Sequence, residues 1–121
     1  MTDPARADFL ALEDNELVRL TLKGDKEAYR ALVERYQGRL FTTALDIVKT
    51  REDAEDVVQE TFVKAFLSLG QFKGESSFYT WLYRIAINTA RNWLAANKHA
   101  PSTPSGFENE EGETFNESDV L

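Results

Sequence analysis

Residues 53–91 read DAEDVVQETFVKAFLSLGQFKGESSFYTWLYRIAINTAR, and this stretch decides the fold. Its first part, residues 53–69, has apolar side chains three and four residues apart, which is the spacing of one face of an amphipathic helix. The members of this apolar stripe are Ala54, Val57, Val58, Thr61, Phe62, Ala65 and Leu69. We therefore predict a helix over residues 53–69 with one face in a hydrophobic core.

The other face of this helix is acidic and polar. Glu52, Asp56, Gln59 and Glu60 are three or four residues apart, so their side chains share one stripe along the helix. Most charged stripes of this kind are simply solvated surface.

A loop follows this helix over residues 71–77, which read QFKGESS. Gly70 and Gly74 break the helical period. Phe72 gives the loop an apolar side chain that a purely solvated loop would not need.

The helical period resumes over residues 77–94, with Ser76 or Ser77 as the N-cap. Trp81 is expected in the core like the other aromatic residues at helical spacing, because such residues usually pack. The predicted buried stripe of this helix is Phe78, Leu82, Ile85, Thr89 and Trp93.

The opposite face of residues 77–94 carries basic, amide and aromatic side chains. Arginine can neutralise a phosphate, asparagine can read a base edge, and a ring stacked on an unpaired base contributes about 1–3 kcal/mol. We therefore expect nucleic-acid chemistry on this face, with Tyr79, Tyr83 and Asn88 as the candidates for base contacts. The side chains of the face are Tyr79, Tyr83, Arg84, Ile87, Asn88 and Arg91.

The runs DAEDVVQETFVKAF and FKGESSFYTWLYRIAINTARN resemble region 2 of a bacterial sigma factor of the extracytoplasmic-function (ECF) group, close to the sigma-E type. The pattern K-G-D-x-x-A-Y-x-x-L-V-x-R-Y at residues 23–36 resembles the start of the same region. The resemblance extends from about residue 15 to residue 94. It implies an all-helical domain that acts in transcription initiation.

This resemblance implies a partner for the acidic stripe. In the family, the D-x-x-Q-E pattern, here Asp56, Gln59 and Glu60, docks on the clamp coiled coil of the largest subunit of core RNA polymerase. The resemblance also implies an anti-sigma factor as a further protein partner.

The resemblance further implies contacts to the minus-ten element of a promoter. Flipping a base out of the non-template strand costs a few kcal/mol of unstacking free energy, so contacts in the pocket must offset that cost. The positions that resemble this pocket are Lys64, Ser68, Phe72, Lys73, Gly74, Glu75 and Ser76. The positions that resemble the recognition-helix contacts to the strand and the upstream duplex are Tyr83, Arg84, Asn88 and Arg91.

One position departs from the housekeeping members of the family. Those proteins use two adjacent tryptophans as a wedge at the DNA fork, whereas this chain has Trp81 followed by Leu82. The departure fits the ECF group and implies weaker melting of DNA, compensated by a more stringent promoter sequence.

The sequence before residue 53 predicts two more helices. Asp14 is the expected N-cap of a short helix that ends near Gly24, and Asp25 is the expected N-cap of a longer one. Thr50 and Asp53 are expected to form a capping box for the next helix. The short helix has Leu17, Val18, Leu20 and Leu22 as its apolar residues, and the stripe of the longer helix is Tyr29, Val33, Tyr36, Leu40, Ala44 and Ile47. We predict an all-α bundle of about four helices over residues 14–97, preceded by a flexible arm at residues 1–13.

Composition limits the class of protein. The 121 residues are 42% hydrophobic, enough for one domain with a core, and they include no cysteine. The net charge is −7, but residues 102–121 hold six acids and no base, while residues 62–98 hold five bases and one acid. We expect a soluble, cytoplasmic protein without membrane insertion, whose own affinity for duplex DNA is weak.

Residues 98–121 are rich in serine, proline, glycine and acid, and we expect them to form a disordered linker. In the family a linker at this place threads the polymerase near its active-site channel; a bare spacer is the alternative. Family members continue into a helix-turn-helix domain that reads the minus-thirty-five element, and residues 1–121 do not include one. We expect either a chain cut from a longer protein or a natural one-domain relative, and the composition of the last residues favours the first.

Enzyme chemistry is not expected. The carboxylates of residues 53–60 lie on a helix surface where nothing separates their pKa values, His99 has no partner residue nearby in sequence, and Gly74 alone is no phosphate loop. No cofactor or metal is expected. The alternative function is a protein-interaction module that binds the polymerase clamp or an anti-sigma factor without reading a promoter.

Overall fold

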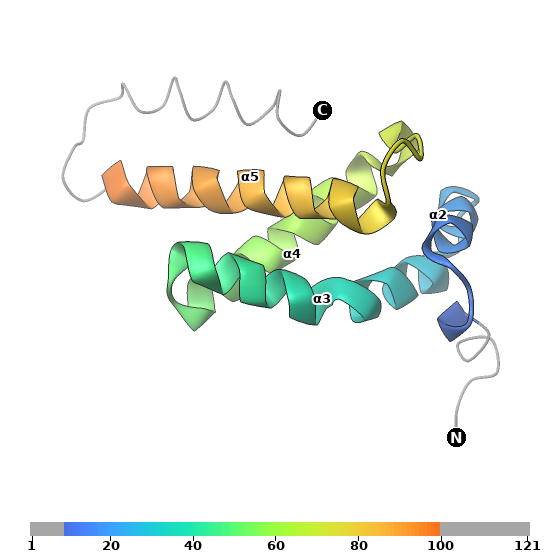
Figure 1. The fold of residues 1–121 in the computed structure, drawn as a ribbon, viewed down its shortest axis with the longest axis horizontal. Coiled ribbons are helices and arrows are strands. Elements are labelled where there is room, and N and C mark those ends of the chain that lie inside the picture. Colours follow the sequence, from blue (N-terminus) through green and yellow to red (C-terminus); the bar gives the residue numbers. More distant parts are fainter. Residues whose placement is uncertain (1–8, 100–121) are drawn as a thin grey trace.

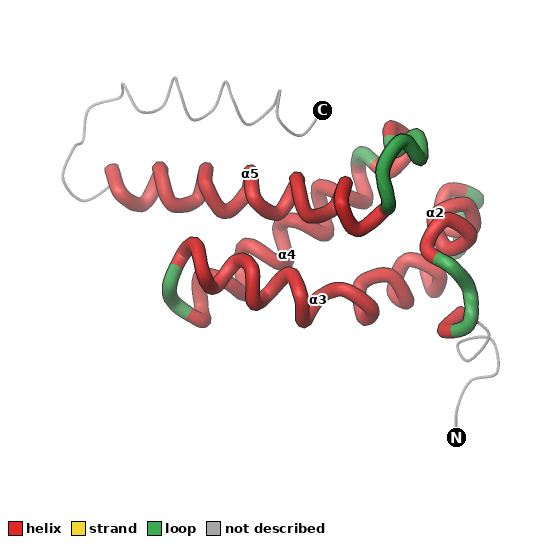
Figure 2. The backbone as a smooth tube through the Cα atoms, in the orientation of Figure 1, coloured by secondary structure: helices red, strands yellow, loops and turns green. Residues whose placement is uncertain are grey.

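The computed structural model describes residues 9–99, with side chains described as far as residue 97. Figures 1 and 2 show helices joined by short loops, and no strand occurs among the described residues, as predicted. The elements after a helical turn at residues 9–10 are α2 (Asp14–Leu22), α3 (Lys26–Val48), α4 (Arg51–Leu67), the 3-10 turn η1 (Leu69–Gln71) and α5 (Phe78–His99).

The three long helices all contact one another. In Figure 1, α5 runs alongside α3, and α4 crosses behind both of them. The short helix α2 packs against α3, near the end where α3 begins. The predicted four-helix bundle is confirmed in this part of the chain.

Side-chain caps fix where three of the helices begin. The Asp25 carboxylate accepts hydrogen bonds from the backbone N–H groups of Glu27 and Ala28, at 3.0 and 3.3 Å. The Thr50 hydroxyl accepts one from the N–H of Asp53, at 3.2 Å, so α4 begins at Arg51, two residues earlier than predicted. The Ser77 hydroxyl accepts one from the N–H of Thr80 at 3.1 Å, which makes Ser77 the cap of α5. Each such cap typically contributes about 1 kcal/mol.

The end of one helix differs from its predicted position. α4 stops at Leu67, two residues before its predicted end, and the chain then tightens into η1. α5 extends beyond the period of residues 77–94 to His99, and its end falls within residues 97–101, where the sequence predicts that the helix ends. The extra turn contains two alanines, which favour helix, and Asn97, whose amide donates to the Trp93 carbonyl at 2.9 Å. The rest of the predicted linker, residues 100–121, lies outside the described residues.

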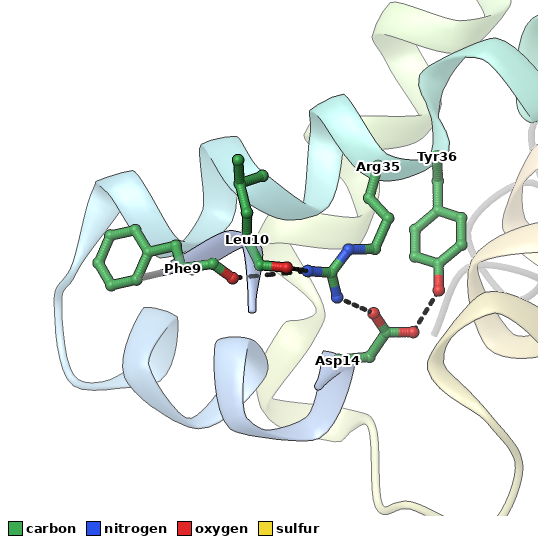
Figure 3. A network of polar contacts seen from close by, with 5 residues as sticks. All are labelled: Phe9, Leu10, Asp14, Arg35 and Tyr36. Atoms are coloured by element: carbon green, nitrogen blue, oxygen red, sulfur yellow. Dashed lines mark hydrogen bonds and ion pairs between the residues drawn. The ribbon is translucent and has the colours of Figure 1, made fainter. Parts of the chain in front are cut away.

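Asp14 is not the N-cap of α2, contrary to prediction. The cap position is Glu13, whose side chain makes no capping hydrogen bond, and Asp14 is the first helical residue. The Asp14 carboxylate instead accepts hydrogen bonds from Arg35, at 2.8 Å, and from the Tyr36 hydroxyl (Figure 3). Arg35 and Tyr36 together give this carboxylate two donors, and Arg35 also gives it an opposite charge, so tertiary contact decides the role of this residue.

The same arginine ties the N-terminal segment to the bundle. The Arg35 guanidinium also donates to the carbonyls of Phe9, at 3.5 Å, and Leu10, at 3.3 Å (Figure 3). The side chains of Phe9 and Leu12 pack against the main core. Residues 9–13, which we expected within a flexible arm, therefore contact the bundle; residues 1–8 lie outside the described residues.

The core has two parts along the bundle. The larger part collects residues from all the helices, including Leu17, Leu32, Leu40, Phe78 and Leu82. The smaller part, Ala44, Val48, Ala54, Val57 and Ala90, lies where the end of α3 meets the start of α4 and the later turns of α5. Burial of Phe78, Leu82, Ile85 and Thr89 confirms most of the stripe predicted for α5, in which Trp93 is only half-buried.

The stripe predicted for α3 is only partly correct. Tyr36, Leu40 and Ala44 are buried as expected, whereas Tyr29 and Val33 are half-buried. The reason is that α3 packs against three helices, so its buried surface is wider than one stripe. The other residues that it buries are Ala28, Ala31, Leu32 and Val48.

We predict that Asp14→Ala lowers the free energy of unfolding by about 1–3 kcal/mol, because the half-buried Arg35 and the Tyr36 hydroxyl both lose their acceptor. Burial and the bond to Asp14 raise the pKa of Tyr36 to about 12, so its hydroxyl is a donor at neutral pH. Urea denaturation measures the effect. The matched control is Glu16→Ala, which removes an exposed pair with Arg19 and should leave the free energy of unfolding almost unchanged. Equal losses in the two variants would contradict the assignment.

Candidate nucleic-acid and protein interfaces

One face of α5 presents polar side chains without partners. Arg84 and Arg91 are exposed, and Asn88, which lies between them on the helix, is half-buried. None of the three makes a hydrogen bond or ion pair with another residue in the part of the chain that the structure describes. Two cations and an amide that nothing inside the domain uses are suited to phosphate and base contacts.

Tyrosines continue this face toward the start of α5. The rings of Tyr79 and Tyr83 lie 5.9 Å apart between centroids, and Tyr83 is exposed while Tyr79 is half-buried. The Tyr79 ring also lies 5.0 Å from the ring of Tyr36 on α3. The predicted candidates Tyr79, Tyr83, Arg84, Asn88 and Arg91 therefore all lie along α5.

The loop before α5 is built on an aromatic cluster. Phe72 is half-buried, with its ring 5.8 Å from that of Phe78 and 5.3 Å from that of Trp81. Gly74 has a φ of 78°, a left-handed conformation that glycine adopts without strain. Lys73, Gly74 and Glu75 are exposed, and Ser76 is half-buried. The cluster thus holds an exposed loop tip beside the first turn of α5.

Two of the predicted pocket residues bond to other residues of the domain. The Lys64 ammonium binds the Glu60 carboxylate at 3.0 Å and the Thr89 hydroxyl of α5 at 3.3 Å, and only 19% of its side chain is exposed. Ser68 is buried, with its hydroxyl bonded to the carbonyl of Lys64. Lys64 therefore lies where α4 contacts α5, and Ser68 is the buried residue that ends α4, so neither lies on the exposed loop tip.

Of the two adjacent positions that carry tryptophan in the housekeeping members, only position 81 has an aromatic ring in this chain. Trp81 is half-buried on Phe72 and Phe78, whereas Leu82 is fully buried in the core. Leu82 therefore has no exposed surface to offer a ligand.

The predicted acidic stripe lies on the surface of α4. Asp56, Gln59 and Glu60 are all exposed, and Glu60 is paired with Lys64 one turn further on. The carboxylate of Asp56 and the amide of Gln59 make no hydrogen bond with other described residues.

An apolar groove of about 520 Å³ adjoins this stripe between α3 and α4. Its α4 wall has large apolar side chains in solvent: Val63 is 58%, Phe66 45% and Leu67 77% exposed. The full lining is Lys26, Tyr29, Val33, Gln37, Val58, Gln59, Phe62, Val63, Phe66 and Leu67. This groove was not predicted, although three apolar residues outside the predicted stripe of α4 were a signal of it.

Among residues 9–99, no helix has the length and apolar character that a membrane crossing requires. Among the side chains of residues 9–97, no group of three or more Asp or Glu residues is arranged to hold a metal ion.

Comparisons with known proteins agree on one family. The family model of Sigma-70 region 2 matches residues 32–100. The chain is 47% identical over 89 residues to the RNA polymerase sigma-H factor of Pseudomonas aeruginosa, which covers 74% of this chain and 46% of that protein. It is 44% identical over 110 residues to the ECF RNA polymerase sigma-E factor of Escherichia coli strain K12, which covers 91% of this chain and 56% of the relative. The chain thus spans about half the length of the curated relatives it matches.

A solved structure shares the fold. An NMR structure of an engineered region 2 of sigmaE in complex with GTAAAA matches with a TM-score of 0.70 and 43% sequence identity. The match covers 75% of this chain and 95% of that one.

Proposed function

We propose, because this chain belongs to the sigma-70 region 2 family, that it docks on core RNA polymerase and recognises and melts the minus-ten element of promoters. Sigma factors are transcription initiation factors and not enzymes, so the expectation of a non-enzyme is confirmed. The relatives named sigma-E belong to the ECF group. The proposed role belongs to the cytoplasm, where transcription takes place.

The observation that carries the DNA-reading part of this proposal is the α5 face. Arg84, Asn88 and Arg91 have no partner among the described residues, and Tyr83 is exposed beside them. Polar groups that the fold does not need are available to phosphates and base edges. The related region 2 with the same fold was solved with GTAAAA bound, which supports a single-stranded minus-ten sequence as the ligand.

The exposed loop tip supports capture of a flipped base. Phe72 is half-buried on the rings of Phe78 and Trp81, so part of its surface is open to solvent, and Lys73 and Ser76 belong to the same loop. In this proposal the loop and Trp81 supply the stacking surface, and Lys64 and Ser68 support the helix junction behind it. The flipped base returns its unstacking energy through that stacking and through hydrogen bonds to its edge.

The acidic stripe and the groove support the docking part of the proposal. Asp56, Gln59 and Glu60 provide acceptors beside apolar side chains that are open to solvent. An apolar centre with a polar rim is the usual anatomy of a protein interface. We assign this surface to the clamp coiled coil of the polymerase, and an anti-sigma factor is the competing occupant.

We predict that the double substitution Asp56→Ala and Gln59→Ala weakens binding to core polymerase at least about tenfold, because both side chains are exposed and bond nothing in the domain. Fluorescence anisotropy of the labelled chain with core polymerase measures it. The matched control is Glu55→Ala, which removes the same single charge from an exposed position of the same helix outside the stripe. Helicity should stay unchanged in both variants. Undiminished binding of the first variant would remove the stripe from the interface.

The DNA-reading proposal is tested with the 121-residue chain and single-stranded oligonucleotides. One oligonucleotide carries GTAAAA, and a series carries each single-base change. Sequence-selective binding establishes the domain as a promoter reader. Unselective or absent binding, with polymerase binding intact, would instead support the interaction-module alternative, in which the groove and stripe are the whole functional surface.

A further inference from the structure

We propose that Arg39 of α3 is a further nucleic-acid-binding residue, which Tyr79 positions to hold a backbone phosphate of the unpaired strand. The inference rests on the proposed function and extends its binding surface from α5 onto α3. No sequence motif quoted above includes Arg39. Its assignment comes from the packing of α3 against α5.

The geometry joins Arg39 to the α5 face. Its guanidinium carbon lies 4.0 Å from the centroid of the Tyr79 ring and 5.7 Å from that of Tyr36. Since the Tyr79 ring in turn lies 5.9 Å from the Tyr83 ring, one continuous row of neighbouring groups runs from α3 to the exposed ring on α5. A guanidinium stacked on a ring keeps its N–H edges free, and those edges match the oxygens of a phosphate.

The charge of Arg39 is not used inside the domain. α3 contains three arginines, and two of them have carboxylate partners: Arg30 pairs with Glu27 at 3.4 Å, and Arg35 with Asp14 at 2.8 Å. Arg39 is exposed and has no carboxylate partner among the described residues. A cation held in place by rings and left without a counter-ion is available to an external anion.

The surface next to Arg39 is open. The preceding residue, Gly38, lies inside α3, where glycine costs about 1 kcal/mol relative to alanine. A Cβ atom at Gly38 would meet nothing within 4 Å, so packing within the domain does not require the glycine. The backbone beside Arg39 can therefore be approached closely by a ligand.

A purely structural role for Arg39 is the rival explanation, since a cation–π contact at an exposed site also ties two helices together. The two explanations differ in what they predict for binding. A structural tie affects the unfolding temperature, whereas a phosphate contact affects affinity for all sequences alike and its dependence on salt.

The test measures binding of the GTAAAA oligonucleotide and its single-base variants to Arg39→Ala over a range of salt concentrations. We expect a loss of affinity on the order of tenfold for every sequence, unchanged selectivity, and a salt slope smaller by about 0.7. Arg30→Ala removes an exposed arginine from the same helix and is the matched control; it should keep wild-type affinity. An equal loss in the two variants, or none in Arg39→Ala, would overturn the inference.

A second measurement does not depend on how the variant folds. In the wild-type chain, the NMR signal of the Arg39 Nε–H group should shift on titration with the oligonucleotide, and an unmoved signal would also overturn the inference. The proposed function is judged separately, by whether the wild-type chain binds selectively. Selective wild-type binding with an unmoved Arg39 signal would reject Arg39 alone.

Discussion

Phe78→Ala is expected to lower the free energy of unfolding by about 3–5 kcal/mol, the range for removing a large aromatic side chain from a core. Phe78 is 1% exposed and is the first residue of α5. Its ring lies 6.1 Å from the ring of Tyr36, 5.8 Å from that of Phe72 and 5.8 Å from that of Trp81. The substitution would leave a cavity where α3, the loop and α5 meet. Closing that cavity would require the packed helices to shift.

Urea denaturation followed by circular dichroism measures this loss. Phe66→Ala is the matched control, because it makes the same chemical change at an exposed position of α4 and should cost about 1 kcal/mol or less. Phe78→Ala should also weaken oligonucleotide binding below its unfolding transition, since Phe72 and Trp81 lose the ring they pack on. Comparable costs at positions 66 and 78 would mean that the aromatic cluster does not anchor the loop.

Local sequence signals were sufficient where a helix is determined by its own residues. Asp25, Thr50 and Ser77 cap the helices that follow them, as predicted, because a cap needs only backbone N–H groups two or three residues away. The buried residues of α5 were also predictable, since that helix presents one face to the core. The match with Sigma-70 region 2 confirms the family that the motifs resembled.

Tertiary contacts were out of reach of the same reasoning. Asp14 has the residue type and position of a cap, but Arg35, 21 residues later, holds its carboxylate. The groove between α3 and α4 depends on the relative placement of those helices, although the exposed apolar residues of α4 were a signal of it. The contact of Arg39 with Tyr79 joins two helices whose relative rotation no local pattern specifies.

The candidate site was predicted unevenly for the same physical reason. The exposure of Arg84 and Arg91, with the half-buried Asn88 between them, follows from their position opposite the buried stripe of one helix. Lys64 and Ser68 also looked available on a helix surface, but Lys64 bonds to Thr89 of α5, and Ser68 is buried with its hydroxyl bonded to the Lys64 carbonyl. Family resemblance gives the position of a residue in the motif, whereas only packing shows which of its atoms remain free.

Asn88→Ala is expected to remove about 1–3 kcal/mol of discrimination at one position of the minus-ten element, which is roughly a five- to 150-fold change in relative affinity. The Asn88 amide has no hydrogen-bond partner among the described residues and lies between two exposed arginines. Phosphate contacts from Arg84 and Arg91 would fix the strand, and an amide between them can donate to and accept from one base edge. Because alanine loses no internal hydrogen bond, the free energy of unfolding should change little.

Affinities for GTAAAA and its six series of single-base changes locate the position that loses discrimination. Asn97→Ala is the matched control on the same helix, because its amide is bonded to the Trp93 carbonyl and should not be available to DNA. An equal loss of affinity for all sequences would indicate that Asn88 contacts the backbone. Unchanged affinity and selectivity would remove Asn88 from the interface and leave the arginines with a positioning role only, since phosphate contacts by themselves carry no sequence information.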